Sequence, residues 1–427
     1  MNSVKRGFLN LAILTGVLAI TCVATAFSWA AGREFEGVKL TYVTTSPMVT
    51  SNLDKEFEKQ TGAKVEVTTV AWPDLHTKLV TTFSAKSPNI DLFIFPDEWT
   101  EEFGKAGWYV PLERYLDSAE KSDISPAYIE LYAYRGHLAG FPIMAMPMLL
   151  FYNEKMLSDA GFKPAATWQE LKEQSIAMQK AGICKYGVTW PLLSGDDMSF
   201  DTFHTLLLAN GGTLFDKSGN PAFNSEKGLE TLQFIVDSLY SSKFASPTSI
   251  QVEKLESLNP FMAGENPYNL NWQFMYGMTT SSQTSAIWKY SKCTTVPSRP
   301  GVAKTGIIAG AALGINPYSK HKEAAIAYAK FIFAKENALR NFKEKGWLPG
   351  WRSFYKDPDA LATDPQLPIY LAQIEKSAVR PKITWYTEFA ELMRLELSRA
   401  WLRECTPKKA LEAAEQKVKA KIAQYEK

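Results

Sequence analysis

The first part of the chain alternates predicted strands with predicted helices. Apolar and polar residues alternate over 38–43 and 64–70, as in strands with one buried face. A nearly continuous apolar run fills 91–95, which is typical of a strand covered on both faces. Apolar residues at helical spacing separate the three runs, one set beginning near Pro73. This order predicts right-handed crossovers and a parallel sheet.

The carboxyl ends of these strands are the first candidate binding positions, because ligands bind beyond that edge of an open α/β sheet. The rule selects segment 44–50, with Thr45 and Ser46, and also Trp72 and Asp97. Asp97 directly follows the third strand and is also predicted to cap the helix after it. Ser51 and Asn52 are predicted to cap the first helix in the same way.

The stretch Gly140–Asn153 is predicted to cross from one domain to another. It opens with a turn, is split by Pro147, and continues as an apolar run, Met148–Tyr152, short enough for a buried strand. Pro142 and Pro147 lack an N–H donor, so neither is expected in the middle of a central strand. A chain of 427 residues exceeds what one hydrophobic core usually serves, so two lobes are expected.

Helical periodicity dominates the rest of the chain. Helices are predicted over 168–180 (capped by Thr167), 200–209, 225–240, 321–334, 336–345, 365–377, 386–404 and 407–425. Segment 186–190 is a short predicted strand. The Pro-rich segment 296–304 is a second predicted crossing, and it leads to a Gly/Ala-rich strand over 305–315.

The N-terminus has the pattern of a secretory signal. Lys5 and Arg6 precede the uncharged stretch 7–32, and two small-x-small sites, 24–26 and 28–30, follow its apolar part. Cleavage would give an exported, extracytoplasmic protein that starts near residue 27 or 31. The alternative is an uncleaved membrane anchor, because 26 uncharged residues can span a bilayer.

Charge and motif content exclude several classes of function. The 47 basic and 45 acidic residues become balanced once Lys5 and Arg6 are removed, so no nucleic-acid footprint is indicated. Phosphate-binding, nucleophile-elbow and metalloprotease motifs are missing from the sequence, and no cofactor or metal is predicted. Cys184, Cys293 and Cys405 could form one disulfide in an oxidising compartment and leave one thiol unpaired.

Aromatic residues carry the clearest functional signal. The chain has 12 Trp and 18 Tyr, and many of them fall in predicted loops or at strand ends: Trp72, Trp99, Trp190, Trp272, Trp347, Trp351, Trp385 and Tyr386. Flat rings can stack on the apolar face of a pyranose, and Asp97, Asn271 and Arg352 lie beside such rings as hydrogen-bonding groups. The alternative is that these rings pack in the core or between lobes.

Six segments together resemble a known family. They are 56–67, 88–99, 136–162, 261–274, 314–333 and 380–393, in order along nearly all of the chain after the signal. The sequence resembles the extracellular solute-binding proteins of ABC importers, in particular the maltose- and trehalose-binding branch. The resemblance implies an α/β, two-lobed, periplasmic-binding-protein-like clamp with discontinuous lobes joined by hinge crossings. The implied lobes are 33–143 plus 298–345, and 146–296 plus 347–427.

The same resemblance implies a ligand set. Matching positions are Asp97, Trp272, Phe274, Gly310, Ala311, Trp351 and Arg352. One position departs from the pattern, since Met146 stands where the maltose binder has an acid in the crossing. Methionine cannot accept strong hydrogen bonds from a sugar, which indicates a less polar subsite or a sugar other than maltose.

The sequence thus predicts a monomeric, non-enzymatic receptor that captures a di- or oligosaccharide and delivers it to membrane permease subunits of an ABC importer. Two alternatives stay open at this point. One is a secreted carbohydrate-active enzyme, which needs two carboxylates facing one cleft. The other is a binder of a different small solute, although the aromatic excess favours sugar over phosphate.

Overall fold

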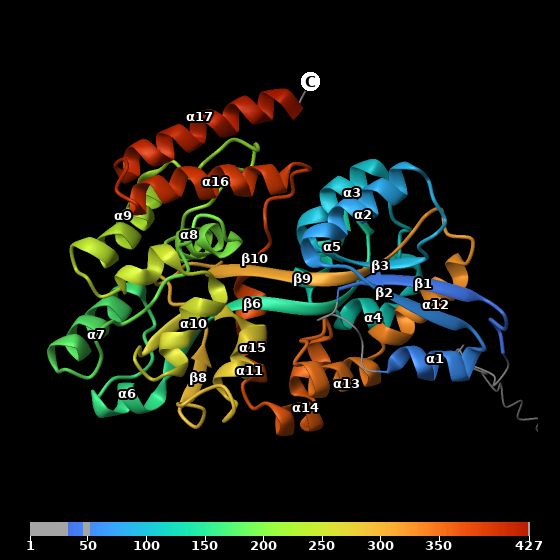
Figure 1. Cartoon of the computed structure of the whole chain (residues 1–427), viewed down its shortest axis with the longest axis horizontal. Helices are drawn as coiled ribbons and strands as arrows, with labels where there is room; N and C mark the ends of the chain where they lie inside the picture. Colours follow the sequence, from blue (N-terminus) through green and yellow to red (C-terminus); the bar gives the residue numbers. More distant parts are fainter. Residues whose placement is uncertain (1–32, 46–51, 426–427) are drawn as a thin grey trace, which may run out of the picture.

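The protein consists of two lobes joined by long strands through the middle of the molecule (Figure 1). The structure, a computed structural model, describes residues 33–45 and 52–425. The predicted signal segment 1–30, Ser46 and Ser51 lie outside the described residues.

The first lobe is built on three parallel strands, as predicted. Its elements are β1 (Lys39–Thr44), α1 (Leu53–Thr61), β2 (Lys64–Thr69), α2 (Trp72–Ser84), β3 (Leu92–Pro96), α3 (Thr100–Ala106), α4 (Ser118–Asp123), α5 (Pro126–Tyr132), β4 (Ala133–Tyr134) and β5 (His137–Leu138). Strand β1 lies between β2 and β3, and both pairings are parallel. Asn52 takes the N-cap position of α1, as predicted, but its backbone is left-handed (φ 51°) and its side chain makes no capping hydrogen bond among the described residues.

Two antiparallel strands, β6 (Phe141–Asn153) and β9 (Gly306–Ile315), join the lobes. Residues 141–147 of β6 pair with β9, and residues 148–153 pair with β7 (Tyr268–Trp272) and β8 (Ser291–Thr294). Both strands run across the centre of Figure 1. The predicted extended crossing is therefore confirmed.

The expectation about the prolines in this crossing is wrong, since both Pro142 and Pro147 lie inside β6. The register shifts between Pro142 and Met144, which is an irregularity that accommodates a residue without a donor. Among the strands that the structure describes, β9 alone pairs with this half of β6, and on the other side Ala145 donates to the Leu348 carbonyl at 2.8 Å. The missing N–H groups therefore interrupt no second ladder of a central strand.

The second lobe is mainly helical around the far half of β6. Its elements are α6 (Glu154–Asp159), α7 (Trp168–Lys180), α8 (Asp197–Ala209), α9 (Glu226–Tyr240), α10 (Lys254–Met262), α11 (Tyr276–Thr279), β10 (Ser377–Ala378), α16 (Tyr386–Trp401) and α17 (Pro407–Tyr425). The predicted cap of α7 is confirmed, because the Thr167 side chain accepts from the Glu170 N–H at 3.1 Å. Segment 186–190 forms only an isolated bridge between Val188 and Ala245, so the predicted strand is wrong.

Four further helices follow β9: α12 (Lys322–Phe333), α13 (Lys335–Lys345), α14 (Pro358–Thr363) and α15 (Leu367–Lys376). Helix α12 covers β9 and β6 in the first lobe, whereas α15 packs under β6 near the centre. The chain therefore passes between the lobes several times. The exact lobe boundaries stay a prediction.

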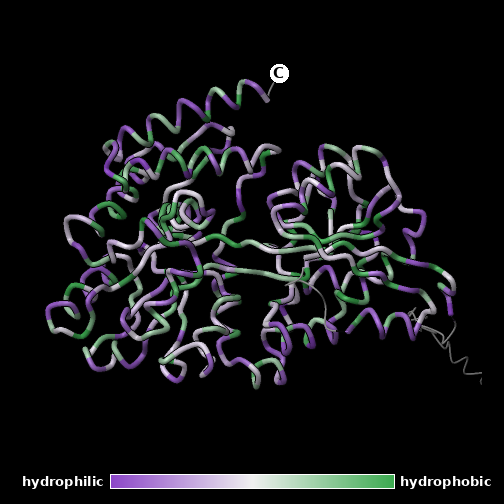
Figure 2. Tube along the Cα trace, viewed as in Figure 1, coloured by the Kyte–Doolittle hydropathy of each residue, from purple (hydrophilic) through white to green (hydrophobic). Residues whose placement is uncertain are grey.

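Buried hydrophobic side chains form two clusters. One surrounds β1, β3 and β9, includes Phe57 and Phe93, and extends to Tyr276. The other fills the second lobe around Trp190 and Phe203. Figure 2 shows the joining strands as largely hydrophobic. None of the helices in the described ranges is long and apolar enough to span a bilayer.

Candidate ligand-binding site between the lobes

Asp97 stands at the end of a fully buried strand, where the sheet meets the second lobe. All five residues of β3 are buried, and Asp97 opens the short 3-10 turn Asp97–Trp99. Its Oδ1 accepts a hydrogen bond from the backbone N–H of Gly310 in β9 at 3.0 Å. The carboxylate caps no helix N-terminus, so the predicted capping role is wrong; Asp97 is held across the sheet instead.

Arg380 connects the two lobes through this carboxylate. Its Nη1 donates to Asp97 Oδ1 at 3.2 Å and to Oδ2 at 3.4 Å, and its Nη2 donates to Asp201 Oδ2 at 2.9 Å. Asp97 belongs to the first lobe and Asp201 to α8 of the second. Lys382 fixes the same segment, because its Nζ donates to the Leu131 carbonyl at 2.8 Å. One buried cation thus binds a carboxylate from each lobe.

Two aromatic rings enclose the guanidinium. The carbon Cζ of Arg380 lies 5.6 Å from the ring centre of Trp272 and 5.8 Å from that of Tyr386. Trp272 ends β7 and Tyr386 begins α16, so both rings come from the second lobe. Such contacts stabilise a cation and keep both rings in fixed positions.

The residues around Arg380, where the two lobes meet, are called the junction below. Burial changes the pKa values of the acidic groups there. It raises the pKa of Glu98 to about 7, with Asp97, Asp197 and Asp201 adding to the rise and Arg380 opposing it. Burial likewise raises the pKa of Asp201 to about 6 against the lowering effect of Arg380. The junction therefore changes its charge between roughly pH 6 and 7, where these carboxyl groups gain or lose protons.

Several polar groups here have no hydrogen-bond partner among the described residues. They include the buried Tyr132 hydroxyl and the Arg380 Nε. Besides burial, the charges of Asp97, Arg380 and Glu98 affect the pKa of Tyr132, so Tyr132 lies in the same cluster. Unpaired buried polar atoms are costly, so a group of them is typical of a site that receives a polar ligand.

The structure brings some of the predicted site residues to this junction. Asp97, Gly310 and Trp272 take part in the Arg380 network. Ala311 follows Gly310 in β9, opposite Pro96, and Met146 lies in β6 opposite Ala309.

Trp72 and Thr45 lie at the carboxyl edge of the parallel strands, as predicted. The Trp72 ring is 42% exposed and stacks on Trp99 at 5.9 Å. Thr45 is buried next to the end of β1.

Other predicted residues lie apart from Arg380. Trp190 is fully buried, donates to Ser238 and packs edge-on against Trp168. Trp351 is 1% exposed, packs against Phe333 at 4.3 Å and donates to its carbonyl.

Arg352 and Asn271 are bonded to residues other than Arg380, and Phe274 is exposed to solvent. Arg352 is ion-paired with Glu375 at 2.8 Å. The Asn271 amide bonds the Lys254 carbonyl and the Trp272 N–H, and Phe274 is exposed. A role in ligand binding for these residues stays a prediction.

Sequence reasoning missed Arg380, Asp201, Tyr132 and Tyr386 as site residues. Arg380 begins the segment 380–393 that supported the family resemblance, and it lies five residues before the aromatic pair Trp385 and Tyr386. A basic residue next to clustered aromatics was the available signal. Asp201 offered none, because it sits inside a regular helix.

The described residues contain no group of three or more His, Cys, Asp and Glu side chains placed to hold a metal ion. Cys184, Cys293 and Cys405 are free thiols in the structure. The disulfide left open by the sequence is therefore not formed here.

The fold is similar to those of known solute-binding proteins over about nine-tenths of the chain. Maltose-bound MalE3 of T. maritima superimposes with a TM-score of 0.79 at 24% identity, over 90% of this chain and 99% of that one. The sugar-binding protein MalE of Xanthomonas citri gives a TM-score of 0.80 at 22% identity, over 91% and 98%. A solute-binding protein from Agrobacterium radiobacter in complex with ribitol gives 0.77 at 24% identity, over 90% and 98%. The two-lobed solute-binding fold is therefore confirmed.

Sequence relatives point the same way. A probable amino-acid ABC transporter periplasmic-binding protein of Sinorhizobium fredii is 22% identical over 416 residues, 95% of this chain and 93% of that protein. The maltotriose-binding protein of Pyrococcus abyssi is 26% identical over 214 residues, 50% and 44% of the two chains. The family model for the bacterial extracellular solute-binding protein matches residues 49–339, well over half of the sequence. The chain belongs to the bacterial extracellular solute-binding protein family.

Proposed function

We propose that this protein captures a neutral sugar between its two lobes and delivers it to the permease of an ABC importer. The observation that carries the proposal is the Arg380 network, which brings together three charged hydrogen-bonding groups, two aromatic rings and unpaired polar atoms at one junction. Charged donors and acceptors form the strong hydrogen bonds that hydroxyl-rich ligands need. Aromatic faces supply the apolar contact.

The ligands of similar structures support the same class. Neighbours of this fold were solved with maltose, ribitol, α-D-tagatose and D-mannitol. All of these are neutral and rich in hydroxyl groups. The ligand size favoured by the sequence is a di- or oligosaccharide. Export across the membrane and a non-enzymatic role complete the proposal, and both agree with the family.

Titration calorimetry of the exported protein tests the proposal directly. The panel contains maltose, trehalose, ribitol and D-mannitol, with glutamate and glycine as amino-acid arms because one relative is named for amino acids. We expect one saturable site for at least one sugar, and the sugar is recovered chemically unchanged by chromatography. Binding of an amino acid in place of every sugar would contradict the substrate class, and turnover would contradict the receptor role.

A matched pair of variants locates the site. Asp97→Asn removes the charge that Arg380 and Gly310 share, whereas Asp159→Asn removes an exposed carboxylate that pairs with the neighbouring Lys155. We expect a loss of sugar affinity with the first variant and none with the second. Equal affinities in the two variants would remove Asp97 from the site.

A further inference from the structure

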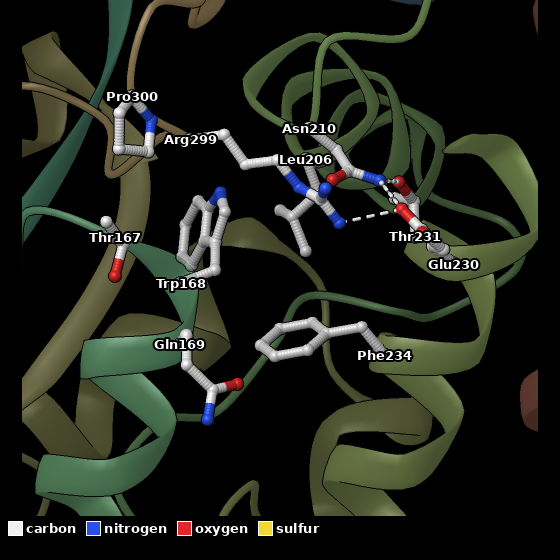
Figure 3. Close-up of a pocket in the computed structure, with 10 residues that line it drawn as sticks. All are labelled: Thr167, Trp168, Gln169, Leu206, Asn210, Glu230, Thr231, Phe234, Arg299 and Pro300. Carbon is white, nitrogen blue, oxygen red and sulfur yellow. Dashed lines mark hydrogen bonds and ion pairs between the residues drawn. The ribbon is translucent and has the colours of Figure 1, made fainter. Parts of the chain in front are cut away.

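A cavity lies in the second lobe, and none of the residues of the Arg380 network lines it. It has a volume of about 280 Å³ and lies between α7, α8, α9 and the segment at Arg299 and Pro300 (Figure 3). Leu206 and Asn210, which line it, lie five and nine residues beyond Asp201, so the cavity is displaced from Asp201 by roughly 7 to 13 Å along α8.

Two aromatic rings form walls of this cavity. Trp168, at the start of α7, and Phe234, in α9, both project toward it (Figure 3). Trp168 packs edge-on against Trp190 at 5.9 Å, and Phe234 packs against Phe244 at 5.7 Å. Because each ring is backed by another, the walls are held in place before any ligand enters. This lowers the ordering cost of binding.

The remaining wall is fixed by the backbone. The Ser298 N–H donates to the Ala166 carbonyl at 2.9 Å, and the Arg299 N–H donates to the Ala209 carbonyl at 3.0 Å. The segment that carries Arg299 and Pro300 is therefore attached to both the start of α7 and the end of α8. The cavity is a built feature of three helices and a loop.

Both hydrogen-bond donors and hydrogen-bond acceptors lie beside the two rings. Asn210 Nδ2 donates to Glu230 at 3.1 Å and to Thr231 at 3.2 Å, which fixes the amide and leaves its oxygen as an acceptor. Trp168 Nε1 is buried and has no hydrogen-bond partner among the described residues. Arg299 adds further donors, since only its Nη2 bonds Glu230, at 2.7 Å.

The charges of the cavity select a neutral ligand. Arg299 and Glu230 form an ion pair, so the two formal charges offset each other. A carboxylate or phosphate would lie beside Glu230, and an amine would lie beside Arg299, at a cost in either case. A compact ring with an apolar face and several hydroxyl groups fits the aromatic walls and the mixed donors and acceptors.

We propose that this cavity is a second carbohydrate site, which binds one pyranose unit against Trp168 and Phe234 outside the interlobe junction. The proposal stands on the cavity alone and holds whether or not the junction binds the same sugar. A site of this kind would let the receptor hold a second sugar molecule. Its affinity is expected in the millimolar range, as for a small contact area.

Fluorine NMR of the whole protein labelled with 5-fluorotryptophan tests the site. The chain has 12 Trp, and the Trp168 signal is assigned by its loss in Trp168→Phe. Methyl α-D-glucopyranoside is the probe, and ribitol, which has no ring, is the comparison. We expect a saturable shift of the Trp168 signal with the glucoside and a much weaker response to ribitol.

Three variants separate a local site from an indirect effect. Arg299→Ala should weaken the glucoside response of Trp168 roughly tenfold, as for loss of a charged hydrogen-bond donor. Arg403→Ala removes another arginine of the same lobe, which lies over Tyr240, and should change nothing. Trp272→Ala should leave the Trp168 response intact even where it abolishes binding at the junction.

Two results would overturn the second site. One is a Trp168 signal that does not move at tens of millimolar glucoside. The other is a response that disappears in Trp272→Ala and persists in Arg299→Ala, because that pattern reports binding at the junction transmitted through the lobe. Neither result bears on sugar binding at the junction, which the calorimetry measures separately.

Discussion

Replacing Arg380 by Met should destabilise the protein far more than replacing any exposed arginine. Arg380 is buried and is the cation for both Asp97 and Asp201. Methionine keeps much of the side-chain length but leaves two carboxylates without their charge partner. Breaking a buried ion pair from one side costs about 3–5 kcal/mol of the free energy of unfolding.

The structure indicates how this cost is divided. Asp97 keeps the hydrogen bond from Gly310 at 3.0 Å after the substitution. The Asp201 carboxylate has Arg380 as its only side-chain hydrogen-bond partner in the described part of the protein. Most of the loss should therefore come from Asp201. Adding Asp201→Asn to Arg380→Met should recover about 1–2 kcal/mol, because an amide carries no charge but still lacks a partner.

The pH dependence of this loss of stability follows from the raised pKa of Asp201. Burial raises the pKa of Asp201 to about 6, above the ordinary value of 3.8, so the folded state binds this proton more readily than the unfolded state. The associated stability is present at low pH and is lost as pH rises through about 6. Arg380 lowers this pKa, so its removal raises the pKa further, and the deficit of Arg380→Met should shrink from pH 8 to pH 5.

Urea unfolding of the wild type and both variants at the two pH values measures these differences. Arg352→Met is the matched control, because its ion pair with Glu375 is about half exposed on both sides, at 47% and 44%. That control should lose less than about 1 kcal/mol. A deficit for Arg380→Met of the same small size at pH 8, or one that stays constant down to pH 5, would refute the reasoning.

Three further predictions concern the junction. Trp272→Ala should weaken sugar binding about thirtyfold, or 2 kcal/mol, in calorimetry. Because the ring is only 4% exposed, the melting temperature should fall too, and a variant that melts early but binds sugar normally would remove Trp272 from the site. Sugar affinity should rise from pH 6 to pH 8 as Glu98, with its pKa of about 7, ionises and accepts from hydroxyl groups; a Glu98→Gln variant that keeps this slope would contradict the assignment. Gly310→Ala should cost about 1–3 kcal/mol in urea unfolding, since its Cβ would lie 2.5 Å from the Met144 carbonyl and 2.8 Å from the Tyr132 hydroxyl; wild-type stability would show that the strands can move apart.

The elements that the sequence predicted well are those with strong local patterns. Strand β3 is apolar at almost every position, and it lies buried on both faces between β1 and β9. The later helices were predictable because their apolar residues recur at helical spacing. Asp97 could be chosen as a site residue because it follows β3 at the carboxyl edge of a parallel sheet.

The errors have a common origin in tertiary contacts. Pro142 and Pro147 argued against the middle of a central strand, but the half of β6 that holds them has a described partner strand on one side alone, which local sequence does not reveal. Asp97 had the local signature of a helix cap, and a long-range pairing with Arg380, 283 residues away, took its place. Segment 186–190 had the composition of a strand but lacks a neighbour to complete a ladder.

Asp97 already makes hydrogen bonds within the protein, and these reduce what it can contribute to sugar affinity. Its oxygens accept from Gly310 and from Arg380 within the protein. A sugar hydroxyl that bonds Asp97 must therefore share or replace a strong existing bond, and the net gain is the difference between the two. The Tyr132 hydroxyl has no such bond to give up in the described structure. A hydrogen bond to this hydroxyl, together with stacking on Trp272, should therefore contribute more to affinity than one to Asp97.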